Sequence, residues 1–206
     1  MSRRPPQHAR SSTHGASGGV DGNSRLTGAT AAVILVLLAL EGVTILKIHS
    51  LLTIHVFIGA LLIPPIIVKI ASTSWRFTKY YGRSPDYVRR GPPAPILRLL
   101  GPMIVVLTIA VMASGVGLVV GAPHSWRVRL LQIHQVTFVL WFMVTALHVL
   151  GHLFETMKLA PLDWFRATRR QVNGASTRQW VVVSGLAIGF VAAVWITPYA
   201  SGWGLL

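Results

Sequence analysis

Five long apolar stretches limit what this chain can fold into. They run approximately over residues 26–48, 51–70, 96–120, 130–154 and 180–199. Each is close to the ~20 residues that an α-helix needs to cross the ~30 Å hydrocarbon core of a bilayer. Because lipid offers no hydrogen-bond partners, the backbone of such a segment must satisfy itself as a helix. The sequence therefore predicts an all-α membrane protein, with a four-helix transmembrane bundle and a fifth, peripheral transmembrane helix.

The composition agrees with this prediction. Hydrophobic residues make up 52% of the chain and charged residues 12%, whereas soluble domains carry about 25% charged residues. The sequence contains no cysteine, which excludes disulfides, thiolate-bound iron–sulfur clusters and covalently attached c-type haem. These features together exclude an intrinsically disordered protein, a disulfide scaffold and a soluble nucleotide-binding enzyme.

The pattern divides the chain into four regions. Residues 1–25 are rich in Ser, Gly, Pro and Arg and predict a disordered basic tail. Residues 26–155 contain the four-helix bundle, and residues 179–206 contain the fifth helix and a short C-terminal end. Residues 156–178 form a connector, in which the run PLDWFRATRRQV predicts an amphipathic helix on the membrane surface.

Basic residues predict the orientation in the membrane, because cytoplasmic loops carry an excess of Lys and Arg. With a cytoplasmic N-terminus, only three of the 19 Lys and Arg residues lie on the external side, namely Lys47, Arg127 and Arg129. We therefore expect a multi-pass protein of the cell membrane with a cytoplasmic N-terminus and an external C-terminus. Contact with membrane lipids then accounts for the formal net charge of +14, and no nucleic acid partner is needed.

Histidines inside the spans are the main candidates for function, since ionisable residues within a bilayer are costly and rare. His55 lies four residues into the second span, and His134 lies four residues into the fourth. Both spans run from outside to inside, so at 1.5 Å per residue both rings lie about 6 Å below the outer edge. Two imidazoles at one depth on facing helices suit the two axial positions of a haem iron. Gly59, one turn after His55, would let a flat macrocycle approach the helix.

The fourth span carries further histidines on nearly the same side. His148 follows His134 by fourteen residues, and His152 follows it by eighteen, which is five full turns. One helix therefore offers a ligand near the outer surface and one or two near the inner surface. A lone intramembrane histidine can instead serve only as an interhelical hydrogen-bond donor.

The sequence here resembles a known family. The run IHVFIGALLIPPIIVKIASTSWRFTKYYG, followed by GPPAPILRLLGP and HQVTFVLWFMVTALHVLGH, is similar to bacterial b-type cytochrome-like membrane proteins, four-helix bundles that bind haem b between paired histidines. The resemblance covers the first four spans. It implies haem b, bis-histidine ligation and a redox partner, with His55, His134 and His148 as candidate iron ligands.

One position departs from the two-haem form of this pattern. Lys69 stands fourteen residues after His55, where that pattern would place another histidine. One haem near the outer surface is therefore expected, and a second, inner haem is left open. We do not expect His55 and His148 to share an iron, because fourteen residues of depth, or about 20 Å, separate them.

Other charged residues in or near the spans carry further hypotheses. Glu41 in the first span either accepts a proton from a docked quinol or is a protonated acid bonded to a neighbouring helix. Lys69, Arg76 and Arg98 either clamp haem propionates or snorkel to lipid phosphates. His148, His152 and Glu155 share one helical stripe and form an alternative metal site.

We therefore expect a membrane electron carrier that passes electrons between quinone or quinol and a partner oxidoreductase. The sequence shows no catalytic triad, P-loop or carboxylate pair, so a subunit role is favoured over an independent enzyme. Two alternatives remain: a cofactor-free transporter in which histidines relay protons, and a passive membrane anchor.

Overall fold

The computed structural model describes residues 18–91, 95–121 and 123–203, which form helices and turns and contain no strand. Five helices are long and apolar enough to cross a membrane. They are α1 (Gly19–Leu46), α2 (Ile48–Tyr81), α4 (Pro95–Val120), α5 (His124–Leu159) and α7 (Ala175–Ile196). The short elements are α3 (Pro85–Arg89), α6 (Arg166–Arg169) and a 3₁₀ helix η1 (Thr197–Trp203). The expected all-α, multi-pass membrane architecture is confirmed.

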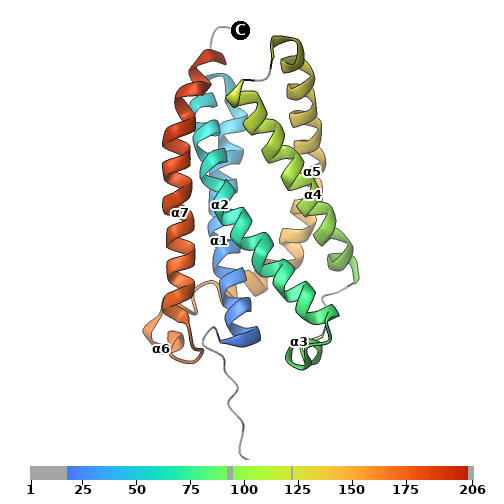
Figure 1. The fold of residues 1–206 in the computed structure, drawn as a ribbon, viewed down its shortest axis with the longest axis vertical. Coiled ribbons are helices and arrows are strands. Elements are labelled where there is room, and N and C mark those ends of the chain that lie inside the picture. Colours follow the sequence, from blue (N-terminus) through green and yellow to red (C-terminus); the bar gives the residue numbers. More distant parts are fainter. Residues whose placement is uncertain (1–17, 92–94, 122, 204–206) are drawn as a thin grey trace, which may run out of the picture.

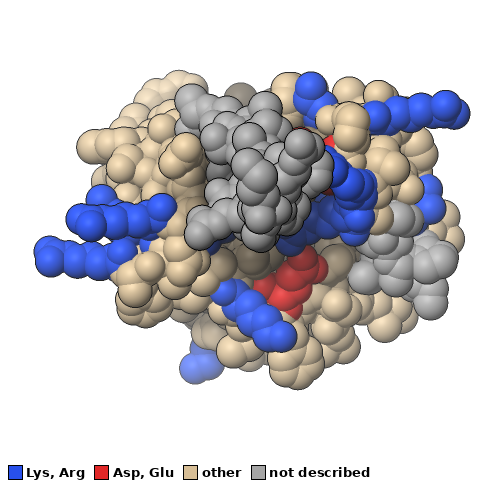
Figure 2. All heavy atoms as spheres, turned by 90° about the horizontal axis from the view of Figure 1, so that it is seen from below, with Lys and Arg blue, Asp and Glu red and all other residues tan. Residues whose placement is uncertain are grey.

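Successive long helices run in opposite directions and define two ends (Figure 1). At the end drawn at the bottom, α3, α6 and the first turns of α1 and α7 lie together; we call this the basic end. Figure 2 views it directly and shows Lys and Arg side chains around the face, with acidic side chains near its middle. The turns from α1 to α2 and from α4 to α5 lie at the opposite end, together with η1 (Figure 1).

The long helices pack in two groups. Helix α2 packs closely against both α1 and α7, and α4 packs closely against α5. The groups contact each other mainly through α1 with α5 and α2 with α4. Helix α7 lies on the flank of the molecule (Figure 1), with Ala193 fully buried and large apolar side chains such as Val191 and Trp195 exposed.

A proline pair explains how α7 approaches α2 so closely. Pro64 and Pro65 lie inside α2. Because a proline has no N–H to bond to the carbonyl four residues earlier, Pro65 leaves the carbonyl of Leu61 without its helical hydrogen bond. The carbonyl oxygen of Leu61 lies so close to Gly189 that an added Cβ atom would approach it to 2.6 Å. A glycine is therefore required at this contact between the two helices.

One predicted boundary and one predicted helix are wrong. Helix α1 begins at Gly19 rather than at residue 26, because the side chain of Arg25 is buried against the α5–α7 connector and secures the first turns. The run expected to form an amphipathic surface helix contains only the single turn α6. Its Asp163 is buried at 3% exposure, so this part of the run faces the interior of the protein.

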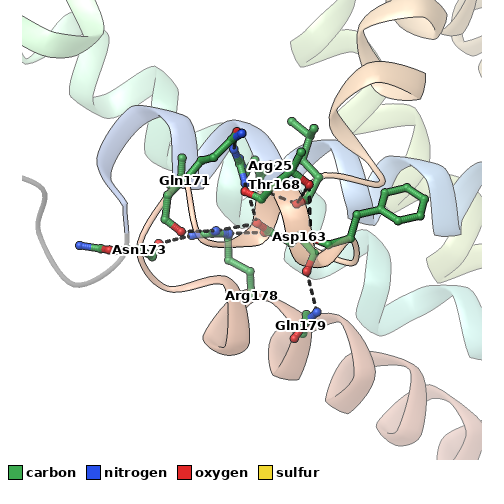
Figure 3. A network of polar contacts seen from close by, with 10 residues as sticks. Arg25, Asp163, Thr168, Gln171, Asn173, Arg178 and Gln179 are labelled. Carbon is green, nitrogen blue, oxygen red and sulfur yellow. Dashed lines mark hydrogen bonds and ion pairs between the residues drawn. The ribbon is translucent and has the colours of Figure 1, made fainter.

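Asp163 is the centre of a polar network that joins three segments at the basic end (Figure 3). Its carboxylate accepts a hydrogen bond from Arg25 of α1 at 3.2 Å. It also accepts two from Arg178 of α7, one from Nη2 at 2.8 Å and one from Nε. Its backbone oxygen accepts a bond from Gln179 at 2.7 Å. Arg25 also donates to the carbonyl of Thr168 at 2.9 Å. These bonds fix α1, the connector and α7 relative to one another.

Candidate functional site

His55 of α2 and His134 of α5 lie against each other in the bundle. Their ring centroids are 6.4 Å apart and their planes are inclined at 88°. Two imidazoles bound to one iron at about 2 Å, with about 1 Å from each ring centre to its nitrogen, would have centroids about 6 Å apart. The separation of the two rings therefore matches that of two axial ligands.

Helix α1 supplies the contacts behind His55. Glu41 Oε1 lies 3.0 Å from His55 Nδ1, and Thr44 Oγ1 lies 2.9 Å from the same nitrogen. The side chains of His55 and Glu41 are 21% and 14% exposed. Glu41 therefore contacts a neighbouring helix, and the side chain that it contacts is the candidate iron ligand itself. Its role as a proton acceptor and its role as a protonated structural acid both stay predictions.

Helix α4 supplies the contacts behind His134. The Nδ1 atom lies 3.1 Å from the carbonyl oxygen of Val111 and 3.1 Å from Ser114 Oγ. Because a carbonyl oxygen only accepts hydrogen bonds, Nδ1 of His134 carries the proton and Nε2 carries the lone pair. A metal-bound histidine characteristically donates its other ring nitrogen to a carbonyl or a carboxylate, and the Nδ1 atom of each ring lies within hydrogen-bond distance of such an oxygen.

Glycines let the helices approach the two rings. A Cβ atom at Gly115 of α4 would lie 3.1 Å from Cε1 of His134, and one at Gly59 of α2 would lie 3.4 Å from Glu41 Oε1. Gly59 therefore lies beside the carboxyl group that contacts His55. Its expected role in admitting a macrocycle stays a prediction.

The inner histidines are arranged differently. The rings of His148 and His152 are neighbours on α5, with centroids 4.7 Å apart, and His152 Nδ1 lies 3.3 Å from Glu155 Oε2. Nδ1 of His148 is buried and has no hydrogen-bond partner. Lys69 Nζ donates to the carbonyl of Thr27 of α1 at 3.2 Å. Two rings that are neighbours on one helix do not form the facing pair that His55 and His134 form.

The three cations proposed as a propionate clamp have separate environments. Lys69 bonds to α1, whereas Arg98 near the start of α4, the third span, donates to the hydroxyl of Tyr81 at the end of α2. Arg76 is half-buried on α2. The Arg98 side chain, one of the three that the clamp would use, is thus already hydrogen-bonded to Tyr81.

Three groups that support the histidines were not singled out from the sequence: Thr44, Ser114 and the carbonyl of Val111. Thr44 and Ser114 are buried hydroxyl residues at 3% and 5% exposure. The sequence does indicate that these two hydroxyl groups have partners, because polar residues in apolar spans need them. It does not indicate which helix supplies the partner.

Within the described ranges, no three His, Asp or Glu side chains gather closely enough to hold a metal ion by themselves. The alternative metal site at His148, His152 and Glu155 is not among such groups and stays a prediction. Comparison with family models, curated proteins and solved structures found no match for this chain. Function is therefore inferred from the contacts of the His55–His134 pair.

Proposed function

We propose that this chain is a membrane electron carrier that holds one haem b between His55 and His134. It passes electrons between a quinone or quinol pool and a partner oxidoreductase. Bound haem supplies one-electron chemistry, because its iron changes oxidation state. In this proposal the protein lies in the cell membrane with its basic end in the cytoplasm, as the excess of Lys and Arg there indicates.

One observation carries the proposal. Two imidazoles from different helices lie 6.4 Å apart, and the Nδ1 atom of each is held by groups of a third or fourth helix. This leaves both Nε2 atoms as the nitrogens available to an iron. A pair used only for interhelical packing would need neither the matched separation nor the matched Nδ1 contacts.

The rest of the chain serves this pair. Helices α2 and α5 carry the two ligands, and α1 and α4 set the orientation of the rings. The exposed apolar side chains of the spans keep the bundle in lipid. The proposal contains one haem, because His148 has another α5 histidine beside it and Lys69 is bonded to α1.

Reduced-minus-oxidised absorption spectra of the purified protein in detergent test the proposal. We expect b-type bands with one haem per chain, and their loss in both His55→Ala and His134→Ala. His49→Ala is the matched control, because His49 is exposed on the same helix as His55, and it should retain the bands. His148→Ala should also retain them. A folded, colourless wild type would contradict the proposal and favour a passive anchor or a proton relay.

A proton relay is the second candidate, and one observation favours it. Glu41, His55 and His134 form a row of ionisable groups across α1, α2 and α5. Glu41 Oε1 lies 3.0 Å from His55 Nδ1, and the ring centroids of His55 and His134 are 6.4 Å apart. Such rows mark proton paths in membrane proteins. Proteoliposomes with an internal pH dye and an imposed potassium diffusion potential distinguish the two. Proton uptake by haem-free protein that is lost in Glu41→Gln would favour the relay.

A further inference from the structure

The hydrogen bonds of Thr44 determine which nitrogen of His55 carries the proton. The hydroxyl of Thr44 donates to the backbone oxygen of Glu41 at 2.6 Å. A hydroxyl has one hydrogen, so Thr44 has only lone pairs to offer His55 Nδ1 at 2.9 Å. Nδ1 of His55 is therefore the donor in that contact. The lone pair of the ring then lies on Nε2, which is the nitrogen that a metal can use.

Glu41 accepts from the same nitrogen. Its Oε1 lies 3.0 Å from His55 Nδ1, so one N–H group faces two oxygens of α1. Glu41 and Thr44 are three residues apart and thus lie on one face of the helix. Their other contacts hold them there: Thr44 is bonded to the Glu41 backbone, and Gly59 leaves room for the carboxyl group.

His134 is held by a different kind of acceptor. Its Nδ1 faces the carbonyl of Val111, and the nearby Ser114 hydroxyl donates to the carbonyl of Ala110 at 2.7 Å. A backbone acceptor is present whatever the side chains of α4 are. The acceptors of His55 are two side chains, so substitutions can remove them.

We propose that Glu41 and Thr44 are positioning residues for His55: they hold its imidazole as the Nδ1–H tautomer and aim Nε2 at the cofactor. This rests on the proposed function, since it assigns a task to Nε2. Partners behind a metal-bound histidine fix its tautomer and raise its basicity, and their loss typically weakens metal binding about 10- to 100-fold. Removing either α1 acceptor should therefore weaken haem retention without removing a ligand.

The test uses the full chain in detergent, with Glu41→Leu and Thr44→Val as the variants, because both remove the acceptor oxygen. Thr44→Ser keeps the hydroxyl and should behave as wild type. Thr30→Val is the matched control, because Thr30 is equally buried on α1 and bonds only to its own helix, at the carbonyl of Leu26. Thermal unfolding checks that each variant is folded.

Two readouts separate this inference from the proposed function. In haem-free protein, ¹⁵N shifts of His55 should show Nδ1–H in wild type, with the other tautomer gaining population in Glu41→Leu and Thr44→Val. In loaded protein, the same variants should release haem to apomyoglobin about 10- to 100-fold more readily. A colourless wild type would overturn the proposed function and this inference together. Normal haem binding with unchanged tautomer and retention in both variants would overturn this inference alone, as would a wild-type His55 in the Nε2–H form.

Discussion

Two buried polar clusters differ in how completely their atoms are paired. In the Arg25–Asp163–Arg178 network, both carboxylate oxygens of Asp163 accept bonds from arginine, and backbone carbonyls take up further donors. In the Glu41–His55–His134 cluster, Glu41 Oε2 is buried without a hydrogen-bond partner. The polar contacts of the two rings with α1 and α4 are made by their Nδ1 atoms.

This difference indicates a structural role for the arginine–aspartate network and a functional role for the histidine cluster. Buried polar groups are almost always hydrogen-bonded, and each exception calls for an explanation. The paired network at the basic end explains how three segments are joined, and nothing in it is left to bind a further group. The histidine cluster keeps binding capacity unused inside the bundle. That unused capacity favours a cofactor or a proton as the missing partner.

The largest effect is expected from Asp163→Ala. It leaves two buried arginines without their shared counter-ion, and breaking a buried ion pair in this way costs about 3–5 kcal/mol. Denaturant titration in detergent, followed by circular dichroism, measures the loss. If the protein binds haem as proposed, haem bands that keep their position in the remaining folded protein would show that the network is structural.

A triple variant checks the reason for this loss. Replacing Arg25 with Met, Asp163 with Leu and Arg178 with Leu removes all charges together, and such apolar replacements are often neutral or stabilising. We expect it to recover most of the stability that Asp163→Ala loses. If instead it is as unstable as the single variant, the network contributes more than charge pairing, and the comparison with the histidine cluster fails.

The fold was largely predictable because a bilayer leaves few choices. Apolar length alone indicates all five spans, and helical rise alone places His55 and His134 at one depth. The partners of these residues were not predictable. Helices that are apolar on most sides carry little information about their rotation, so nothing in the sequence indicated that Thr44 and Ser114 face the two rings.

The arginine–aspartate network was missed for a related reason. The sequence alone places Arg25 in a tail and Asp163 in a surface helix, because the excess of Lys and Arg on one side predicts orientation but does not indicate which residues pair. Asp163 is 138 residues from Arg25 along the chain. They come together because α1 packs beside the connector, and α1 already begins at Gly19, before Arg25.

A smaller effect is expected from Ser114→Ala. His134 loses one hydrogen-bond partner but keeps the carbonyl of Val111, so the loss in free energy of unfolding should be about 0.5–1.5 kcal/mol. Ser184→Ala is the matched control, because Ser184 is exposed and its hydroxyl bonds to its own helix at the carbonyl of Val181. A loss as large as that of Asp163→Ala would mean that the histidine cluster is itself a structural network.

The smallest effect is expected from Asp86→Ala in α3. Its ion pair with Arg89 is exposed, with side chains 61% and 76% accessible, and an exposed pair contributes only about 0.2–1 kcal/mol. The same denaturant titration should give a difference in this range that shrinks further in high salt, because solvent ions screen it. Asp163 and Asp86 are both aspartates paired with arginine at the basic end. A similar loss from both would mean that burial does not set the cost of an unpaired charge here, and the unpaired oxygen of Glu41 would then no longer indicate a functional site.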